Sequence, residues 1–465
     1  IVRSRLEGLG PVTADALAAP LRLSRQRIEQ TLHRLQSEGF VVTGRFAADA
    51  PQWCERRLLA RIHRYTLQRL RREVEPVSPA RFQHFLLDWH GLTEPPEGVE
   101  ALAGAIEKLE GFSLAAAAWE SDVLPGRVAD YAPHLLDQLL STGRFTWLRL
   151  VPPAPGGERR RRPGPLRQTP IALVERASMP LWRSFVPVTA EPGALSPAGA
   201  RVLAALQEKG AQFFVDLVSA TGMLRTQVEE ALSELVAWGL ASADTFNGIR
   251  ALIAPAHKRP SLARRGRRRG RHAPAVDTAG RWTSLVQAST HREVKDARGA
   301  TAMTDMASLE SVAWTLLGRY GVVFRRLLDR ETALPPWREL LYVLRRLEAR
   351  GEIRGGRFVD GFSGEQFALP DAVGALKRRR EGGAGESLVA VSAADPLNLA
   401  GILLPGPRIP ASPGNRILFR GGRPVAELIA GEVRYHDELP AESQWRFRQK
   451  LLRRGSGPDN AARGF

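Results

Sequence analysis

Arginine brings the most distinctive chemistry to this sequence. The 465 residues carry 67 Lys and Arg against 49 Asp and Glu, and the formal net charge at pH 7 is +18. Guanidinium groups form paired hydrogen bonds with phosphate oxygens, so an excess rich in arginine indicates a polyanionic partner, and nucleic acid is the first choice. The alternative is that a GC-rich genome supplies arginine codons without any such partner.

The arginines with the strongest claim on DNA lie on two expected helices, their flanks and one broken segment, while a long basic helix at 51–74 could either follow a phosphate backbone or pack between modules. Ser24 caps the first helix, and Pro335-Pro336 begin the second. Residues 257–272, HKRPSLARRGRRRGRH, lack apolar periodicity and favour a flexible basic arm. The residues that we expect to contact DNA are Arg25, Arg27, Arg34, Arg264, Arg265, Arg267, Arg268, Arg269, Arg338, Arg345, Arg346, Arg354 and Arg357. The alternatives are ordinary solvated helix faces and a solvated linker.

Other kinds of chemistry find little support in the residue types. Cys54 is the only cysteine and the nine histidines form no ligand-spaced cluster, so we expect no metal site. No GxxxxGK[ST] loop and no Asp-Glu-x-His box is present, so we expect no ATP or Mg²⁺ to be held by this chain. No apolar run is long enough for a membrane span, and we expect a cytoplasmic, nucleoid-associated protein with no membrane partner.

A recurring helix ending indicates the elements that position these residues. Two leucines one turn apart are followed four residues later by a glycine that can adopt the left-handed conformation and turn the chain into a hairpin. The pattern occurs at Leu32-Leu35-Gly39, Leu136-Leu139-Gly143, Leu232-Leu235-Gly239 and Leu344-Leu347-Gly351. Copies roughly 100 residues apart predict four similar units. Residues 196–253 predict a complete winged-helix module of three helices followed by a strand pair.

These patterns predict a mainly α protein with small β elements, in which tandem winged-helix modules are followed by a C-terminal β-barrel. The third helix of the third module exposes Glu229, Glu230 and Glu234, which repel phosphate, so we expect this copy to pack against protein. The expected domains are winged helix 1 (1–50), a helical linker with winged-helix-like module 2 (51–151), winged helix 3 (165–256), a basic arm and irregular linker (257–308), winged helix 4 (309–380), the β-barrel (386–437), and a C-terminal helix and tail (438–465).

Several of these segments resemble one known family. Residues 208–222, 234–252, 319–370 and 392–411 closely resemble the C-terminal region of bacterial large helicase-related (Lhr) superfamily 2 helicases. The resemblance implies a DNA-binding, non-ATPase region of a DNA repair helicase that mediates oligomer assembly, with a tetramer suggested. It also implies a helicase core in the same polypeptide, to which ATP and Mg²⁺ would belong. A simple transcription factor is an alternative based on winged helices alone.

A more distant resemblance connects the chain with winged-helix DNA glycosylases of the AlkZ/YcaQ type. Residues 108–139 are similar to the stretch that holds the family's Gln-x-Gln or Gln-x-Asp motif, which here reads Glu110-Gly111-Phe112, and SAADPL at 392–397 resembles the family's Ser-x-x-Asp-Pro-Leu. The resemblance implies, as an alternative function, excision of damaged bases or uracil, for which a carboxylate must lie near C1′ of a flipped nucleotide. The carboxylates placed there are Glu110, Glu120, Asp122 and Asp395.

Overall fold

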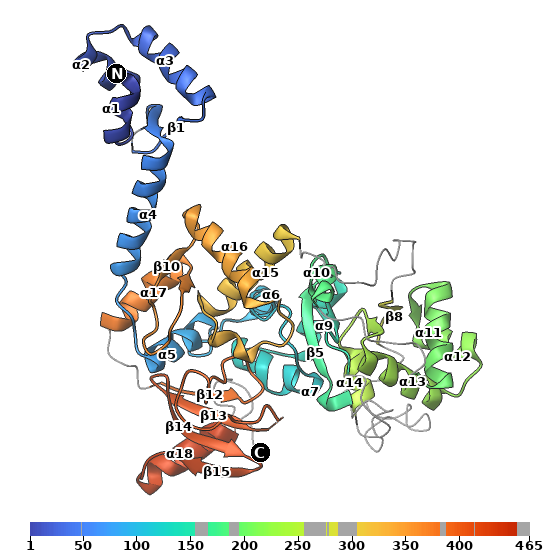
Figure 1. Ribbon diagram of the computed structural model, residues 1–465. Coiled ribbons are helices and arrows are strands. Elements are labelled where there is room, and N and C mark those ends of the chain that lie inside the picture. The colour runs from blue at the N-terminus through green and yellow to red at the C-terminus, as the bar shows by residue number, and fades with distance from the viewer. Residues whose placement is uncertain are drawn as a thin grey trace. The chain divides into compact units, whose positions relative to one another are not determined.

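A computed structural model describes residues 1–47, 49–153, 166–185, 195–254, 276, 279–286, 305–381, 387–412 and 414–452. The chain divides into two compact units, residues 1–75 with 354–357, and residues 76–353 with 358–465. Helices dominate and the strands form small antiparallel sheets (Figure 1). The predicted mainly α class with winged-helix modules is confirmed.

The first unit begins with a winged helix. Its elements are α1 (Val2–Gly8), α2 (Ala14–Leu21), α3 (Arg25–Ser37), β1 (Val41–Gly44) and β2 (Gln52–Glu55). The two strands pair as an antiparallel wing, and Val12 adds a single bridge to Trp53. Leu6, Leu17 and Leu32 meet in one small core because each occupies the apolar stripe of its own helix.

A long helix, α4 (Arg56–Arg72), follows the wing in the same unit. The Glu55 carboxylate begins it by accepting hydrogen bonds from the backbone N–H groups of Arg57 at 2.8 Å and Leu58 at 2.6 Å. None of its residues is buried, although its sequence is amphipathic.

The second module is also built from helices and a small sheet, with more short elements between them than the first. It contains α5 (Pro79–Trp89), α6 (Gly98–Lys108), β3 (Leu114–Ala115), α7 (Ala116–Ala118), the π-helix η1 (Trp119–Val123), α8 (Leu124–Arg127), α9 (Pro133–Ser141), β4 (Phe145–Leu148), the 3-10 helix η2 (Leu166–Gln168), β5 (Pro170–Glu175) and α10 (Met179–Ser184). Strand β5 is the centre of the sheet β3-β5-β4. It lies beyond residue 151, where the sequence suggested an end to this module.

The third module is built from α11 (Pro197–Lys209), β6 (Gln212–Phe213), α12 (Phe214–Thr221), α13 (Arg225–Trp238), β7 (Ala241–Ala243), α14 (Asn247–Ile253) and β8 (Arg281–Ser284). Strand β8 pairs with both β6 and β7 and completes the sheet β6-β8-β7. Its sequence, RWTS, falls in the segment expected to be an irregular linker. Trp282, at its centre, is completely buried.

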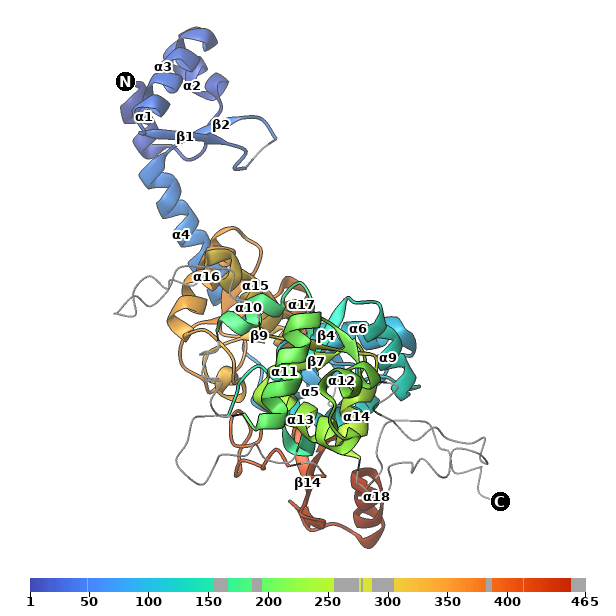
Figure 2. The same ribbon diagram turned by 90° about the vertical axis from the view of Figure 1, so that its right-hand side faces the viewer.

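The second and third modules share one hydrophobic core. Strands β4 and β7 lie side by side, and both are labelled in Figure 2. The Trp147 indole donates a hydrogen bond to the Thr245 carbonyl at 3.0 Å, and the Ser242 hydroxyl donates to the Trp147 carbonyl at 2.5 Å. The rings of Trp147 and Trp282 meet edge to face, with centroids 6.3 Å apart. The two modules are therefore packed as one body.

The fourth module contains α15 (Met306–Tyr320), β9 (Val322–Val323), the 3-10 helix η7 (Leu327–Arg330), α16 (Trp337–Ala349), β10 (Arg354–Gly356) and β11 (Gln366–Ala368), and α17 (Pro370–Glu381) follows it. Strand β11 pairs antiparallel with β9. Helix α15 packs against α16 because Leu340, Leu344 and Leu347 form the buried stripe of α16. The four glycines that follow the recurring helices, Gly39, Gly143, Gly239 and Gly351, have φ of 71°, 80°, 73° and 78°, which confirms the predicted left-handed endings.

The predicted C-terminal β-barrel is wrong. Strands β12 (Leu388–Ser392), β13 (Arg416–Arg420), β14 (Arg423–Ile429) and β15 (Glu432–Tyr435) form an open antiparallel sheet in sequence order, and no sheet among the described residues closes into a barrel. A barrel needs its first and last strands to pair. Here α18 (Ala441–Leu452) instead packs across β12, β13 and β14 and covers the apolar face (Figure 1).

A second reason lies in the segment after β12. Residues 393–404 were expected to continue as strand, but they form turns in the second unit, where Leu397 and Leu399 are completely buried. The Asn398 side chain donates hydrogen bonds to the carbonyls of Ala393 at 2.8 Å and Ile409 at 3.1 Å. Because this segment forms turns held by these side-chain hydrogen bonds, it supplies no strand with which to close the sheet.

Candidate nucleic-acid interface

Helix α3 presents one basic face of the first unit. The Ser24 hydroxyl accepts a hydrogen bond from the Arg27 backbone N–H at 3.4 Å and begins the helix. Arg25 and Arg34 are exposed and bind carboxylates on the surface, Arg25 with Asp15 at 3.0 Å and Glu29 at 2.8 Å, Arg34 with Glu38 at 3.3 Å. Arg27 is also exposed. Exposed pairs of this kind contribute little to stability because water screens them, so a phosphate can replace the carboxylate.

Helix α16 presents a second basic face, in the second unit. Arg338, Arg345 and Arg346 are exposed on the side opposite the buried leucines. Arg345 is paired with Glu365 at 2.6 Å, whereas Arg338 and Arg346 form no ion pair with the carboxylates that the structure describes. Arg338 and Arg345 are seven residues apart, which places them on the same side two turns along the helix.

The remaining predicted DNA contacts are not on these two helices. Arg354 opens β10 and Arg357 follows it, and both are exposed. These two residues belong to the first compact unit. The basic-arm residues Arg264, Arg265, Arg267, Arg268 and Arg269 lie outside the described residues.

The corresponding third helices of the other two modules are engaged within the protein. On α9, the Asp137 carboxylate accepts hydrogen bonds from the backbone N–H groups of Phe246 at 2.9 Å and Asn247 at 3.2 Å, at the start of α14. On α13, half of the helix is buried and Glu234 accepts a hydrogen bond from the Ser196 backbone N–H at 2.8 Å. The Arg149 guanidinium donates to the Ala237 carbonyl at 2.6 Å. The acidic third module therefore packs on the second module of the same chain.

Two of the candidate catalytic carboxylates lie on the π-helix η1 and bind arginines from distant parts of the chain. Glu120 pairs with Arg250 of α14 at 2.7 Å and accepts a hydrogen bond from the Tyr131 hydroxyl at 2.7 Å. Asp122 pairs with Arg416 of β13, and both side chains are almost completely buried. The helix thereby joins the third module to the C-terminal sheet.

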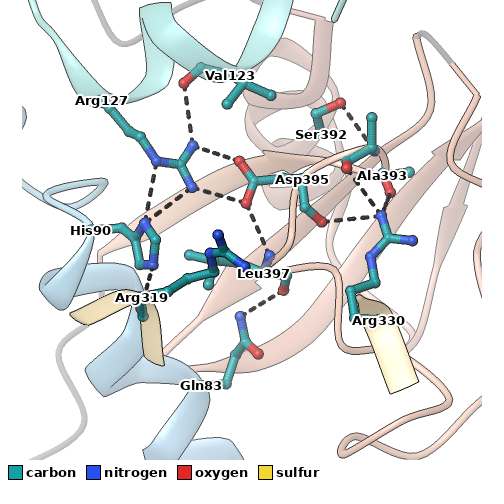
Figure 3. Close-up of polar contacts among 11 residues, drawn as sticks. Gln83, His90, Val123, Arg127, Arg319, Arg330, Ser392, Ala393, Asp395 and Leu397 are labelled. Atoms are coloured by element: carbon teal, nitrogen blue, oxygen red, sulfur yellow. Dashed lines mark hydrogen bonds and ion pairs between the residues drawn. The ribbon is translucent and has the colours of Figure 1, made fainter. Parts of the chain in front are cut away.

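Asp395 forms the most buried of these pairs (Figure 3). Its two carboxylate oxygens accept hydrogen bonds from Arg127 at 2.5 Å and 2.9 Å, and the two side chains are 3% and 1% exposed. A third hydrogen bond comes from the Leu397 backbone N–H at 2.9 Å. Arg330 holds the same turn by donating to three carbonyls, those of Ala393, Ala394 and Asp395.

His90 also contacts Arg127, and its imidazole ring is uncharged. Its Nδ1 accepts a hydrogen bond from the Arg127 Nε at 3.3 Å, so the proton is on Nε2, which donates to the Arg319 carbonyl at 2.8 Å. Burial and the positive charges of Arg127 and Lys108 hold the pKa of His90 well below its usual value. Figure 3 shows the contacts between Arg127 and His90, and only a neutral imidazole has the free lone pair that accepts them.

Glu110 differs from the other three because uncharged groups hold its carboxyl. The Trp182 indole donates to it at 3.2 Å and the Glu175 backbone N–H at 3.3 Å. Burial raises its pKa above the usual value. Trp182 lies against Gly111, whose φ is +76° and where an added Cβ would come within 2.6 Å of the indole ring.

The four carboxylates are thus bound to four different sets of partners and are not gathered around one common partner. Sequence reasoning missed the residues that hold them, namely Arg127, Arg250, Arg416 and Trp182. No local signal distinguishes a buried arginine from an exposed one, since the partners are 268 residues apart for Asp395 and 294 for Asp122. Among the described residues, no group of three or more His, Cys, Asp or Glu side chains could hold a metal ion. None of the described helices is both long and apolar enough to cross a membrane.

The order of helices and strands, with basic third helices in two of four modules, defines a tandem winged-helix protein. Residues 77–174 and 302–388 each match a family model described as "Large helicase-related protein, winged-helix domain", for the third and fourth such domains respectively. The chain is 30% identical over 450 residues to "Lhr helicase/ probable uracil glycosylase" of Mycolicibacterium smegmatis, a match that covers 90% of this chain and 27% of that protein.

A second relative agrees with this assignment. The match to "Lhr helicase/uracil glycosylase" of Escherichia coli K12 is 27% identical over 463 residues and covers 90% of this chain and 28% of that protein. The chain belongs to the large helicase-related (Lhr) family. It spans just over a quarter of the length of these curated relatives.

Proposed function

We propose that this chain is the DNA-binding winged-helix region of an Lhr-type helicase and that it contacts the phosphate backbone through α3 and α16. The observation that carries the proposal is the contrast among the four third helices. Those of the second and third modules are engaged inside the protein, while α3 and α16 expose arginine. The relatives are named helicases and are much longer, so we also propose that a helicase core precedes or follows this region in the same polypeptide.

Backbone binding of this kind has a measurable signature. Each phosphate neutralised by an arginine releases counterions, so the affinity for duplex DNA falls steeply with salt and depends little on sequence. Replacing both Arg338 and Arg346 by alanine is expected to reduce the log–log salt slope by about 2 and to weaken binding equally for unrelated sequences. Fluorescence anisotropy at several salt concentrations measures both quantities.

A matched control is available on another module. Arg201 is exposed on α11, a helix that carries neither basic face, and Arg201→Ala removes one positive charge there. We expect its salt slope to equal that of the unsubstituted protein. An unchanged slope in the Arg338→Ala/Arg346→Ala protein would exclude α16 as a contact.

As a second function we propose excision of uracil from DNA, which the names of both relatives favour because the matches cover 90% of this chain. Glu120, Asp122 and Asp395 are neutralised by arginines, whereas the Glu110 carboxyl has a raised pKa and uncharged partners. Of the four, Glu110 is therefore the best placed to transfer a proton. Trp182 covers it, so a flipped nucleotide reaches it only if α10 moves.

The test is incubation of the chain with duplex DNA that contains one uracil, followed by detection of abasic sites. We expect uracil release without ATP, loss of release in Glu110→Gln, and retained release in Glu120→Gln at temperatures where both variants are folded. Release by Glu110→Gln at the unsubstituted rate rules out this carboxyl, and absence of release by the parent chain rules out the second function.

A further inference from the structure

Helix α18 has one face buried and one face open. Phe447 and Leu451 are four residues apart and lie in the core against the C-terminal sheet. Trp445 and Gln449, also four residues apart, precede them by two positions and therefore point about 200° away around the helix. Trp445 is 65% exposed, which is unusual for so large an apolar side chain.

An open hollow lies beside this outer face. Its volume is about 460 Å³, and it is lined by Leu388, Trp445, Arg446, Gln449 and Lys450. Pockets for small ligands measure about 300 to 1,000 Å³, so the hollow has room for one nucleotide. It combines an aromatic face, two basic side chains and a carboxamide, while Leu388 contributes an apolar wall from β12.

We propose that this hollow binds one unpaired nucleotide of a single strand, an inference that rests on the proposed DNA-binding function and names a substrate class for it. Trp445 stacks on the base, Arg446 pairs with a phosphate, and the Gln449 carboxamide contacts the edge of the base. Glu442 lies one turn before Arg446 on α18, so the phosphate lies toward Lys450, at the other end of the hollow. Bases in a duplex already stack on one another, and the hollow therefore selects single-stranded over double-stranded DNA.

The test compares the binding of fluorescently labelled (dT)12 and of a DNA hairpin by anisotropy. Stacking on an aromatic side chain corresponds to roughly a 5- to 150-fold change in affinity per base. We expect Trp445→Ala to weaken (dT)12 binding within this range, Trp445→Phe to restore most of it, and hairpin binding to stay unchanged. Because Trp445 is exposed, all variants are expected to melt at the parent temperature. The control is Tyr65→Ala, which removes a 68% exposed aromatic ring on α4.

Several outcomes would overturn the inference. Unchanged (dT)12 binding in Trp445→Ala excludes the hollow, and equal weakening of (dT)12 and hairpin excludes selection of an unpaired base. Competition by dTMP as strong as that by unlabelled (dT)12 makes a free nucleotide the ligand. Failure of the proposed function is detected by a different measurement. It would appear as an unchanged salt slope for hairpin binding in Arg338→Ala/Arg346→Ala, and this result does not depend on the affinity of Trp445→Ala for (dT)12.

Discussion

Asp395→Ala is expected to lower the free energy of unfolding by about 3–5 kcal/mol, because it leaves the Arg127 guanidinium buried without its counter-charge. His90 cannot compensate, since its ring is neutral and already accepts from Arg127. Urea unfolding of the parent and the variant measures the loss. Any loss of the proposed uracil release in this variant could come from unfolding, so activity data on Asp395 are informative only alongside stability data.

Two further variants test whether the loss of stability in Asp395→Ala comes from the buried, unpaired charge of Arg127. Asp244→Ala removes the partner of an exposed arginine, Arg281, in the same compact unit, and we expect it to cost at most about 1 kcal/mol. Replacing both Arg127 and Asp395 by leucine removes both charges and should cost less than the sum of the single changes. Equal losses for Asp395→Ala and Asp244→Ala would show that burial of the pair contributes nothing.

Gly422→Ala is the second change for which we expect a large loss of stability. An added Cβ at Gly422 would lie 1.9 Å from the Ala80 carbonyl oxygen and 2.6 Å from the His84 backbone nitrogen, both on α5. Backbone atoms of a packed helix cannot rotate away, so the hairpin between β13 and β14 must move off the helix. Overpacking of this kind costs about 1–3 kcal/mol in addition to the strain of a left-handed alanine.

Gly431→Ala is the matched control for Gly422→Ala. Its φ of +90° is close to the +79° of Gly422, but an added Cβ meets nothing within 4 Å. We expect it to lose only the strain of the left-handed conformation, about 1–2 kcal/mol. Thermal melting of the two variants side by side isolates the steric contribution, and indistinguishable melting temperatures would refute the contact between the hairpin and α5.

The winged-helix modules were predictable because their signals are local. The leucine stripes of α3 and α16 repeat at helical spacing, and the glycine that ends each helix has the positive φ that its position required. Because the leucine stripe marks the buried side of such a helix, an arginine on the opposite side can be predicted to be exposed. The basic faces that we propose for DNA were therefore identifiable from the sequence, and the acidic residues of α13 predicted its packing against protein. The engagement of α9 through Asp137 was not identifiable, because its partners lie on α14.

The tertiary structure decided the features that depend on distant partners. Strands β5 and β8 join their sheets across long stretches of chain, and the turns after β12 bury their leucines instead of closing a barrel. Asp122 and Asp395 each pair with one arginine among many, and these arginines are 294 and 268 residues away in the sequence. Sequence by itself determined the helices, their caps and their charged faces, because these depend on neighbours within a few turns. Pairing and burial depend on which surfaces meet, and only the folded chain specifies that.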